Sequence, residues 1–122
     1  MRVVRWLPAL LIALVIWILS ATPDLTFTTG TLDLILRKSA HVGIFATLTA
    51  ACVLGFRGSG LTPAAAIGAG ASLALLYAVV DELHQSFVPS RVGAPLDVAI
   101  DAVGVVLVSL VLLRVTTHRR FA

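Results

Sequence analysis

The chain has 122 residues, of which 59% are hydrophobic and 12% charged, about half the charged fraction of an average soluble domain. This composition is typical of an integral membrane protein, and the length leaves no room for a separate soluble domain. The net charge of +3 comes from Lys and Arg near the chain ends and in short gaps, not from a basic stripe interleaved with aromatics, which argues against a nucleic-acid partner.

Hydropathy predicts four transmembrane helices, each close to the ~20 residues that cross a bilayer core. The predicted spans are 4–21, 34–56, 63–88 and 96–113. The gaps between them are rich in Gly, Pro and Ser, which end helices and turn the chain. We therefore expect an all-α membrane protein, with a single domain over 1–122 that forms a compact bundle of four transmembrane helices.

The first span has an alternative interpretation as a cleaved signal peptide. Arg2 and Arg5 would be its basic region, 7–19 its apolar region and 20–22 its cleavage site. Leu19 stands where such a site prefers a small residue, so a retained membrane anchor is favoured.

Basic residues predict the orientation of the bundle. They precede the first span, separate the second from the third, and follow the fourth: Arg2, Arg5, Arg57, Arg114, Arg119 and Arg120. The positive-inside rule assigns all three groups to the cytoplasm. Both termini are then cytoplasmic, an N-in/C-in topology, and the first and third connections face the other side.

Small residues predict that the second and third spans are neighbours. They recur every four positions along each span, and such ridges let two membrane helices approach closely. The ridges consist of Gly43, Thr47, Ala51 and Gly55 on the second span and Ala64, Gly68 and Ser72 on the third.

Ionisable side chains in three of the predicted spans fall at one depth. With a rise of ~1.5 Å per helical residue, His41, Asp81 and Asp101 come out about 9–12 Å below the extracytoplasmic ends of their helices. The remaining polar residues lie nearer that surface and form the mouth of the layer: Lys38, Glu82, Gln85 and Asp97, with Arg91 in the connecting loop. His84 faces either the cavity or the lipid head groups. A charge within a membrane helix costs at least ~2.5 kcal/mol, so this concentration predicts a functional site.

The same polar residues form motifs that resemble the VanZ-like family of small bacterial membrane proteins. The motifs are Lys38-Ser-Ala-His41 with Phe45, the string Asp81-Glu-Leu-His-Gln-Ser-Phe-Val-Pro-Ser-Arg91, and Asp97 with Gly104. The resemblance covers approximately residues 20–110. The family often has Asn where this chain has Asp101 and Tyr where it has Phe45, so roles of an amide or a phenol do not transfer to these positions.

The resemblance implies a location in the bacterial inner membrane, and the positive-inside rule directs the polar site to the extracytoplasmic side. It also implies a link to teicoplanin resistance and kinship with membrane enzymes that exchange or remove lipid head groups. We therefore expect an enzyme that modifies the head group of an outer-leaflet lipid or a lipid-linked cell-envelope precursor. One alternative is a non-enzymatic protein that binds the antibiotic or its lipid-linked target. Another is a small ion or proton pathway, although the polar residues stop in one half of the membrane.

Phosphoryl chemistry needs a base or nucleophile and positive charge around the phosphate. The predicted catalytic residues are His41 as base or nucleophile, Asp81 or Glu82 orienting it, and His84 beside them. The predicted substrate-binding residues are Lys38 and Arg91 for phosphate and Gln85, Asp97 and Asp101 for the acceptor. Arg37 is instead expected to extend to the lipid head groups.

A divalent metal is compatible with these residue types, but no recognised ligand spacing indicates one. His41, Asp81, His84 and Asp101 together offer two imidazoles and two carboxylates. The expected partner is a lipid or lipid-linked substrate, and a dimer is compatible with so small a bundle.

Overall fold

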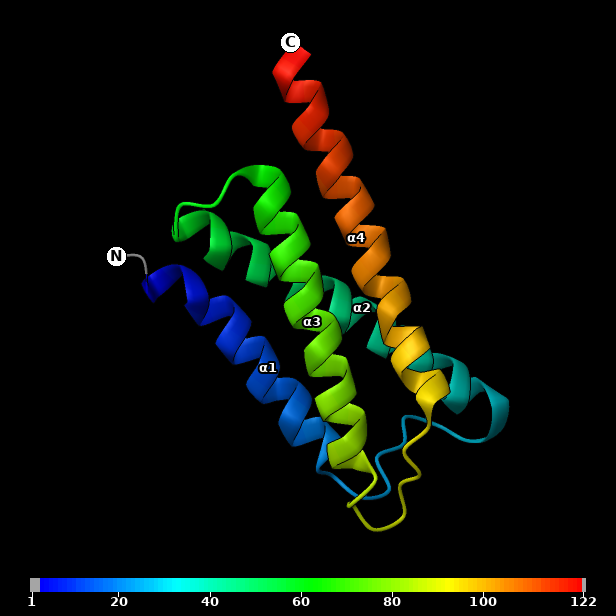
Figure 1. Ribbon diagram of the computed structural model, residues 1–122. Coiled ribbons are helices and arrows are strands. Elements are labelled where there is room, and N and C mark those ends of the chain that lie inside the picture. The colour runs from blue at the N-terminus through cyan, green and yellow to red at the C-terminus, as the bar shows by residue number, and fades with distance from the viewer. Residues whose placement is uncertain (1–2, 122) are drawn as a thin grey trace.

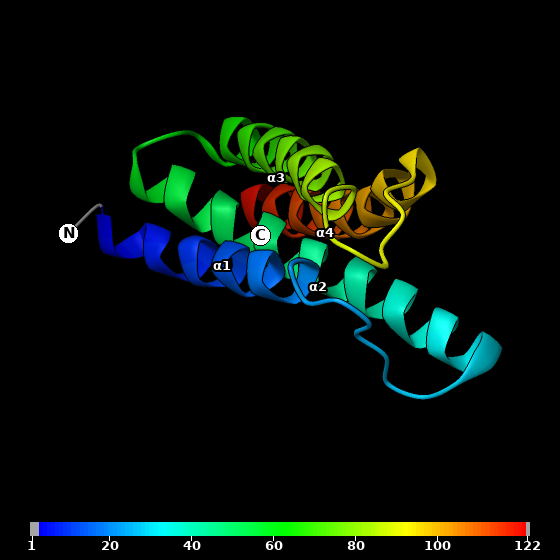
Figure 2. The same ribbon diagram turned by 90° about the horizontal axis from the view of Figure 1, so that it is seen from below.

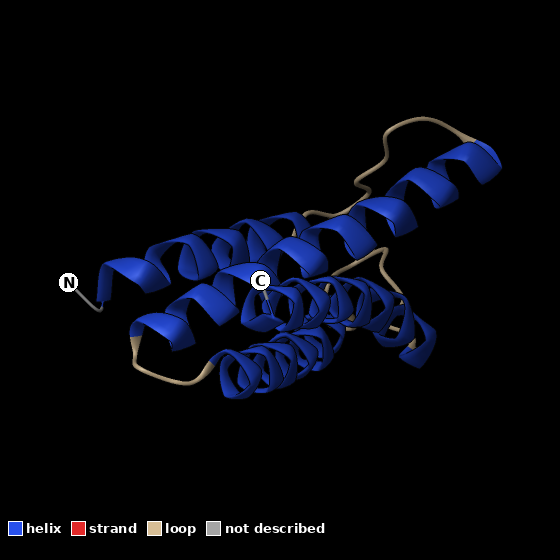
Figure 3. Cartoon of the chain, turned by 90° about the horizontal axis from the view of Figure 1, so that it is seen from above, coloured by secondary structure: helices blue, strands red, loops and turns tan. Residues whose placement is uncertain are grey.

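Residues 3–121 are described by a computed structural model in which every regular element is helical (Figure 3). A short 3-10 helix, η1 (Val3–Trp6), leads into α1 (Leu7–Ser20). The remaining helices are α2 (Gly30–Gly58), α3 (Pro63–Gln85) and α4 (Pro95–Phe121). Four segments within these residues are long and apolar enough to cross a membrane, which confirms the predicted number of spans.

The helices run up and down, so that the two long connections lie at one end of the bundle (Figure 1). Residues 21–29 and 86–94 form that end, which we call the loop end, and the turn at 59–62 lies at the other. Both described ends of the chain also lie away from the loop end (Figure 1). α2 is the central helix, because its contacts with α1, α3 and α4 are more extensive than those of any other helix (Figure 2).

The interior of the bundle is small and closely packed. Phe45, Leu48 and Cys52 of α2 are buried against Ala74 and Ala78 of α3. The large apolar side chains of α1 and α4 are mostly exposed instead, including Leu10, Leu14, Leu107 and Leu110. An apolar exterior around a small interior is what a lipid environment requires.

The helix boundaries differ from the predicted spans where polar residues continue a helix. α2 begins at Gly30 rather than at 34, because Asp33 accepts hydrogen bonds from the backbone amides of Phe27 and Thr28, at 2.7 and 3.1 Å, and so fixes the chain where the helix starts. α4 runs to Phe121 rather than to 113, since loss of hydropathy ends a span but does not end a helix. α3 stops at Gln85 rather than at 88, because a residue before proline, here Val88, is driven out of the helical region.

The predicted contact between the second and third spans is confirmed, but the predicted ridges do not form it. On α2, Gly43 and Thr47 are exposed and Gly55 lies against Trp6. On α3, Gly68, like the other two members of its ridge, is exposed. The face of α3 that is buried is offset by two residues and consists of Ala66, Gly70, Ala74 and Ala78. A Cβ on Gly70 would lie 2.7 Å from Val53 Cγ2 and 3.0 Å from the Val53 amide nitrogen. Both faces have small residues every four positions, so spacing alone does not identify the packed one.

This offset gives a test of helix packing. Gly70→Ala is expected to lower the thermal unfolding midpoint, because overpacking an interface typically costs about 1–3 kcal/mol. Gly68→Ala is the matched control and should hold or raise the midpoint, since nothing lies within 4 Å of its Cβ and Ala favours a helix over Gly. The measurement is heat-induced labelling of Cys52, the single cysteine, which is buried. The reverse order of the two midpoints would contradict this packing of α3 on α2.

Candidate functional site

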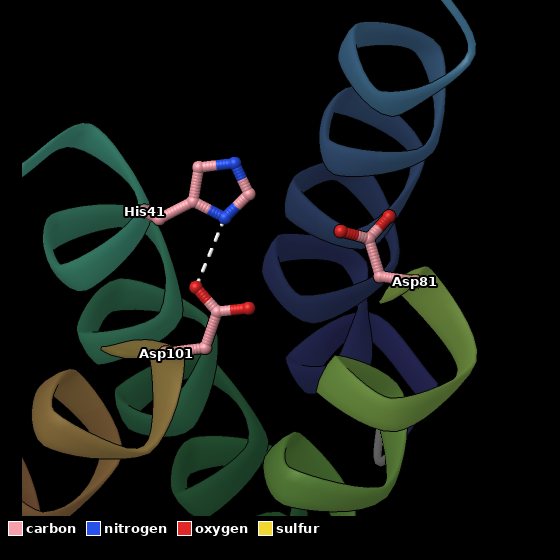
Figure 4. Close-up of side chains that lie close together, drawn as sticks. All are labelled: His41, Asp81 and Asp101. Carbon is pink, nitrogen blue, oxygen red and sulfur yellow. Dashed lines mark hydrogen bonds and ion pairs between the residues drawn. The ribbon is translucent and has the colours of Figure 1, made fainter. Parts of the chain in front are cut away.

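Three polar residues from three helices meet inside the bundle near its loop end (Figure 4). They are His41 of α2, Asp81 of α3 and Asp101 of α4. One nitrogen of the imidazole and one oxygen of each carboxylate all lie within 4.8 Å of one another. Asp81 and Asp101 are buried, at 0% and 1% exposure. The three residues predicted to share one layer are therefore brought together, although they lie eleven, four and six residues from the nearest ends of α2, α3 and α4 rather than at equal distances.

Asp101 is the carboxylate that contacts His41. Its Oδ1 lies 2.9 Å from His41 Nδ1. The expectation that Asp81 or Glu82 would orient the imidazole, and that Asp101 would bind the acceptor, does not match this contact. Helix spacing placed all these acids on facing surfaces but did not identify which one reaches the ring. Because Nδ1 is directed at Asp101, the other ring nitrogen, Nε2, is left for a ligand.

A chain of hydrogen bonds fixes the position of Asp81. Gln85 Nε2 donates to Asp81 Oδ2 at 2.9 Å and to Ser20 Oγ at 3.2 Å. Arg91 Nη1 in turn donates to Gln85 Oε1 at 3.2 Å. Gln85 therefore contacts a catalytic candidate rather than standing free for a substrate, and it connects α1 to α3.

Arg91 joins the two connections of the loop end. Its Nε donates to the carbonyl of Thr22 at 3.1 Å and its Nη2 to the carbonyl of Leu19 at 3.0 Å. The backbone amide of Asp24 adds a contact of 3.3 Å to Ser90 Oγ. Arg91 was predicted to bind phosphate, but all three of its nitrogens contact the protein. Its first effect is to hold the loop end together.

Arg91→Lys is therefore expected to lower stability. The single ammonium of lysine cannot reproduce the three contacts that the planar guanidinium of Arg91 makes. Hydrogen bonds from a charged group contribute about 1.5–3 kcal/mol to stability. We expect the free energy of unfolding to fall by an amount near the lower end of that range, because Arg91 is only half-buried. Heat-induced labelling of Cys52 measures the loss. An unchanged midpoint, combined with weaker binding of a phosphate ligand, would return Arg91 to its predicted role.

Glu82 holds the start of α4. Its Oε1 accepts a hydrogen bond of 2.5 Å from the backbone amide of Ala94, the residue before the first residue of the helix. Glu82 is 6% exposed and does not line the main cavity. The structure thus places it behind the site, as a residue that positions the loop, and not beside His41 as expected.

His84 contacts α1 rather than the cluster. Its ring stacks on Trp17 with centroids 3.7 Å apart and planes 1° apart. It does not line the main cavity, and the metal-type group formed by His41, Asp81 and Asp101 does not include it. The predicted grouping of two imidazoles with two carboxylates is therefore not formed.

The main cavity, of about 420 Å³, opens beside His41 at the loop end. Its polar lining combines the cations Arg37, Lys38 and Arg91 with the acids Asp24 and Asp97. Lys38 Nζ forms an ion pair with Asp97, and Arg37 Nε forms one of 2.7 Å with Asp33. Its apolar lining comes from α1, α2 and both long connections and includes Ile16, Leu19, Leu25, Phe27, Ile44 and Val92.

Sequence reasoning missed the part that the first helix and the first connection play in this cavity. Ser20, Asp24 and Arg37 all line it, although Arg37 was expected to extend to lipid head groups. Ser20 is 3% exposed through its contact with Gln85. Nothing in its sequence surroundings marks it, because serine is common wherever a span ends.

Four long apolar helices around a buried polar cluster define an integral membrane protein of several spans. A family model described as VanZ/LLP1 matches residues 4–116. The chain therefore belongs to the VanZ/LLP1 family, as its motifs suggested. Searches of curated proteins and of solved structures gave no match.

Proposed function

We propose that this chain is a membrane enzyme that cleaves or exchanges the phosphate-linked head group of a lipid or lipid-linked cell-envelope precursor. The observation that carries the proposal is the position of His41. Its side chain is 28% exposed and lines the cavity, while its Nδ1 contacts an aspartate that is 1% exposed. An imidazole held by a buried carboxylate, with its other nitrogen free, is a common arrangement for a general base.

The lining of the cavity supports a phosphate-bearing lipid as the substrate. Three cations and two acids line it, and Lys38 has the point charge that suits a phosphate oxygen. Apolar side chains from α1 and the first connection share the same cavity, so an acyl or prenyl chain can lie against them while the phosphate meets the cations. Lys38 would then divide its charge between Asp97 and the phosphate.

The proposed reaction follows from these positions. His41 Nε2 takes the proton of a water or of an acceptor hydroxyl, whose oxygen forms a new bond to phosphorus. The bond between phosphorus and the departing alcohol breaks, and that alcohol takes the proton from His41. Asp101 stabilises the imidazolium in between through its contact with Nδ1.

The orientation belongs to the same proposal. Arg5, Arg57 and Arg114 lie in elements or turns away from the loop end, whereas the cavity lies at the loop end. The positive-inside rule then directs the cavity to the extracytoplasmic side of a bacterial inner membrane. There it would act on outer-leaflet lipids, and a change in lipid-linked precursors would alter glycopeptide susceptibility.

Purified protein in lipid nanodiscs tests the proposal. The nanodiscs contain phosphatidylglycerol or a polyprenyl-phosphate-linked precursor, and mass spectrometry follows released or exchanged head groups. Wild type is expected to form a product that His41→Ala does not form. His118→Ala is the matched control, because His118 is an exposed residue of α4 and does not line the cavity. Equal product from wild type and His41→Ala would refute the enzymatic proposal, and binding of a precursor without turnover would favour the binding protein instead.

A further inference from the structure

Two buried carboxylates in the cluster each have one oxygen held and one oxygen free. Asp81 Oδ2 accepts from Gln85 Nε2, and Asp101 Oδ1 contacts His41 Nδ1, both at 2.9 Å. Asp81 Oδ1 and Asp101 Oδ2 are buried and have no hydrogen-bond partner. Buried polar atoms are rarely left unpartnered, so two in one cluster point to a missing ligand. Metal-binding carboxylates have this pattern, in which an outer contact fixes the orientation of the ligand.

The separation of the carboxylates suits a single ion. Their ligand-type oxygens, with a His41 nitrogen, lie within 4.8 Å of one another, and no hydrogen bond joins the two acids. One cation can bridge such a gap, because Mg–O distances are about 2.1 Å and Ca–O distances about 2.3–2.6 Å. Figure 4 shows an oxygen of Asp101 on the side of Asp81, and one of Asp81 on the side of His41 and Asp101.

The negative charge of the two carboxylates also favours a bound cation. Among the residues whose side chains are described, Lys38 pairs with Asp97 and Arg37 with Asp33. His41 is the sole basic group in that part of the chain that pairs with either Asp81 or Asp101. An uncompensated charge in a membrane interior is costly. A divalent ion would neutralise both carboxylates at once.

The cluster borders the cavity through two side chains. His41 and Gln85 line the cavity, and the same two side chains contact Asp101 and Asp81 directly. The free carboxylate oxygens therefore lie one side chain away from the space that the proposed substrate would occupy.

We infer that Asp81 Oδ1 and Asp101 Oδ2 bind a divalent cation of the oxygen-preferring class, such as Mg²⁺, Ca²⁺ or Mn²⁺. Water fills its other positions, as is usual for a magnesium-type ion held by two carboxylates. His41 keeps its contact with Asp101. In the part of this inference that rests on the proposed function, a phosphate oxygen of the lipid replaces one of the waters, and the ion shares the negative charge of the phosphate with Lys38.

A manganese titration tests the site without any substrate. Wild type in a phosphate-free nonionic detergent is stripped with EDTA, and free Mn²⁺ is followed by electron paramagnetic resonance. One ion per chain is expected to bind. Asp81→Asn and the double variant Asp81→Asn, Asp101→Asn should weaken binding by at least about tenfold, the lower end of what loss of even an outer contact causes. His41→Ala removes an outer contact of Asp101 and should weaken binding by about 10- to 100-fold, whereas the double variant, which removes both ligands, should weaken it further.

Asp24→Asn is the matched control and should bind as wild type does. Asp24 lines the cavity but has a positive φ of 50°, which asparagine also tolerates, so the change removes a charge without straining the loop. Melting curves with and without Mn²⁺ exclude misfolding as the cause of lost binding. The ion should raise the midpoint of wild type, and it should leave that of the double variant unchanged.

Absence of bound Mn²⁺ in the wild type would overturn the inference, as would equal binding in the double variant. This result is separate from the fate of the proposed function, because the titration contains no lipid phosphate. Mn²⁺ binding without head-group turnover would support the ion site and contradict the enzyme. Head-group turnover that survives EDTA, in a chain that binds no Mn²⁺, would support the enzyme and contradict the ion site.

Discussion

Alanine at His41 and alanine at Asp101 are each expected to lower the rate of head-group turnover by about 10²- to 10⁴-fold, the usual contribution of a positioned acid or base. His41→Ala removes the group that moves the proton. Asp101→Ala leaves the imidazole in the cavity but removes the carboxylate 2.9 Å from its Nδ1. The measurement is single-turnover product formation in nanodiscs, with each variant folded by the criterion of protected Cys52.

The double variant His41→Ala, Asp101→Ala tests whether the two residues act together. If His41 and Asp101 act as a unit, removing both should slow the reaction little more than removing His41 alone. Effects that multiply in the double variant would show that Asp101 does not act through the imidazole.

Gly104→Ala is expected to destabilise the bundle more than Gly70→Ala does. A Cβ at Gly104 would overlap the carbonyl oxygen of Val42 and lie 3.1 Å from the amide nitrogen of Ala46. Both atoms belong to the backbone of α2, so no side-chain rotation relieves the clash and the two helices must separate. Overpacking typically costs about 1–3 kcal/mol, and we expect the free energy of unfolding to fall by an amount at or above the upper end of this range.

The same change should also impair the site, because Asp101 lies one helical turn before Gly104 on α4. Moving α4 away from α2 lengthens the contact between Asp101 and His41. Gly43→Ala is the control on α2, where nothing lies within 4 Å of the added Cβ. Heat-induced labelling of Cys52 and head-group turnover are measured together. A Gly104→Ala protein as stable and as active as Gly43→Ala would contradict the close approach of α2 and α4.

The number of spans and the grouping of His41, Asp81 and Asp101 could be predicted from counts along the chain. The predicted depths were less accurate, because α2 begins four residues earlier and α3 ends three residues earlier than the predicted spans, so the three residues meet without lying at equal distances from the ends of their helices. Lys38 and Asp97 were both expected at the mouth of the site, and they form an ion pair that the sequence did not predict.

The sequence did not predict which side chains touch, because contacts depend on helix rotation and on loops. Glu82 and His84 follow Asp81 in one motif, but one reaches the amide of Ala94 and the other the ring of Trp17. Arg91 turns back toward α1 because the loop carries it there, and no periodicity describes a loop. A motif therefore identified the important residues without separating those that line the cavity from those that hold it in shape.

The even number of helices has a consequence for experiments in living cells. Because the chain crosses the bundle four times, both of its described ends lie away from the end that holds the cavity (Figure 1). A reporter fused after α4 would therefore be separated from the cavity by the whole thickness of the membrane. Alkaline phosphatase, which is active only outside the cytoplasm, should stay silent there and become active when inserted into 21–29 or 86–94. The fusion after α4 would thus report which leaflet the cavity faces without changing any residue that lines it, whereas the two insertions change the lining and serve only to report topology.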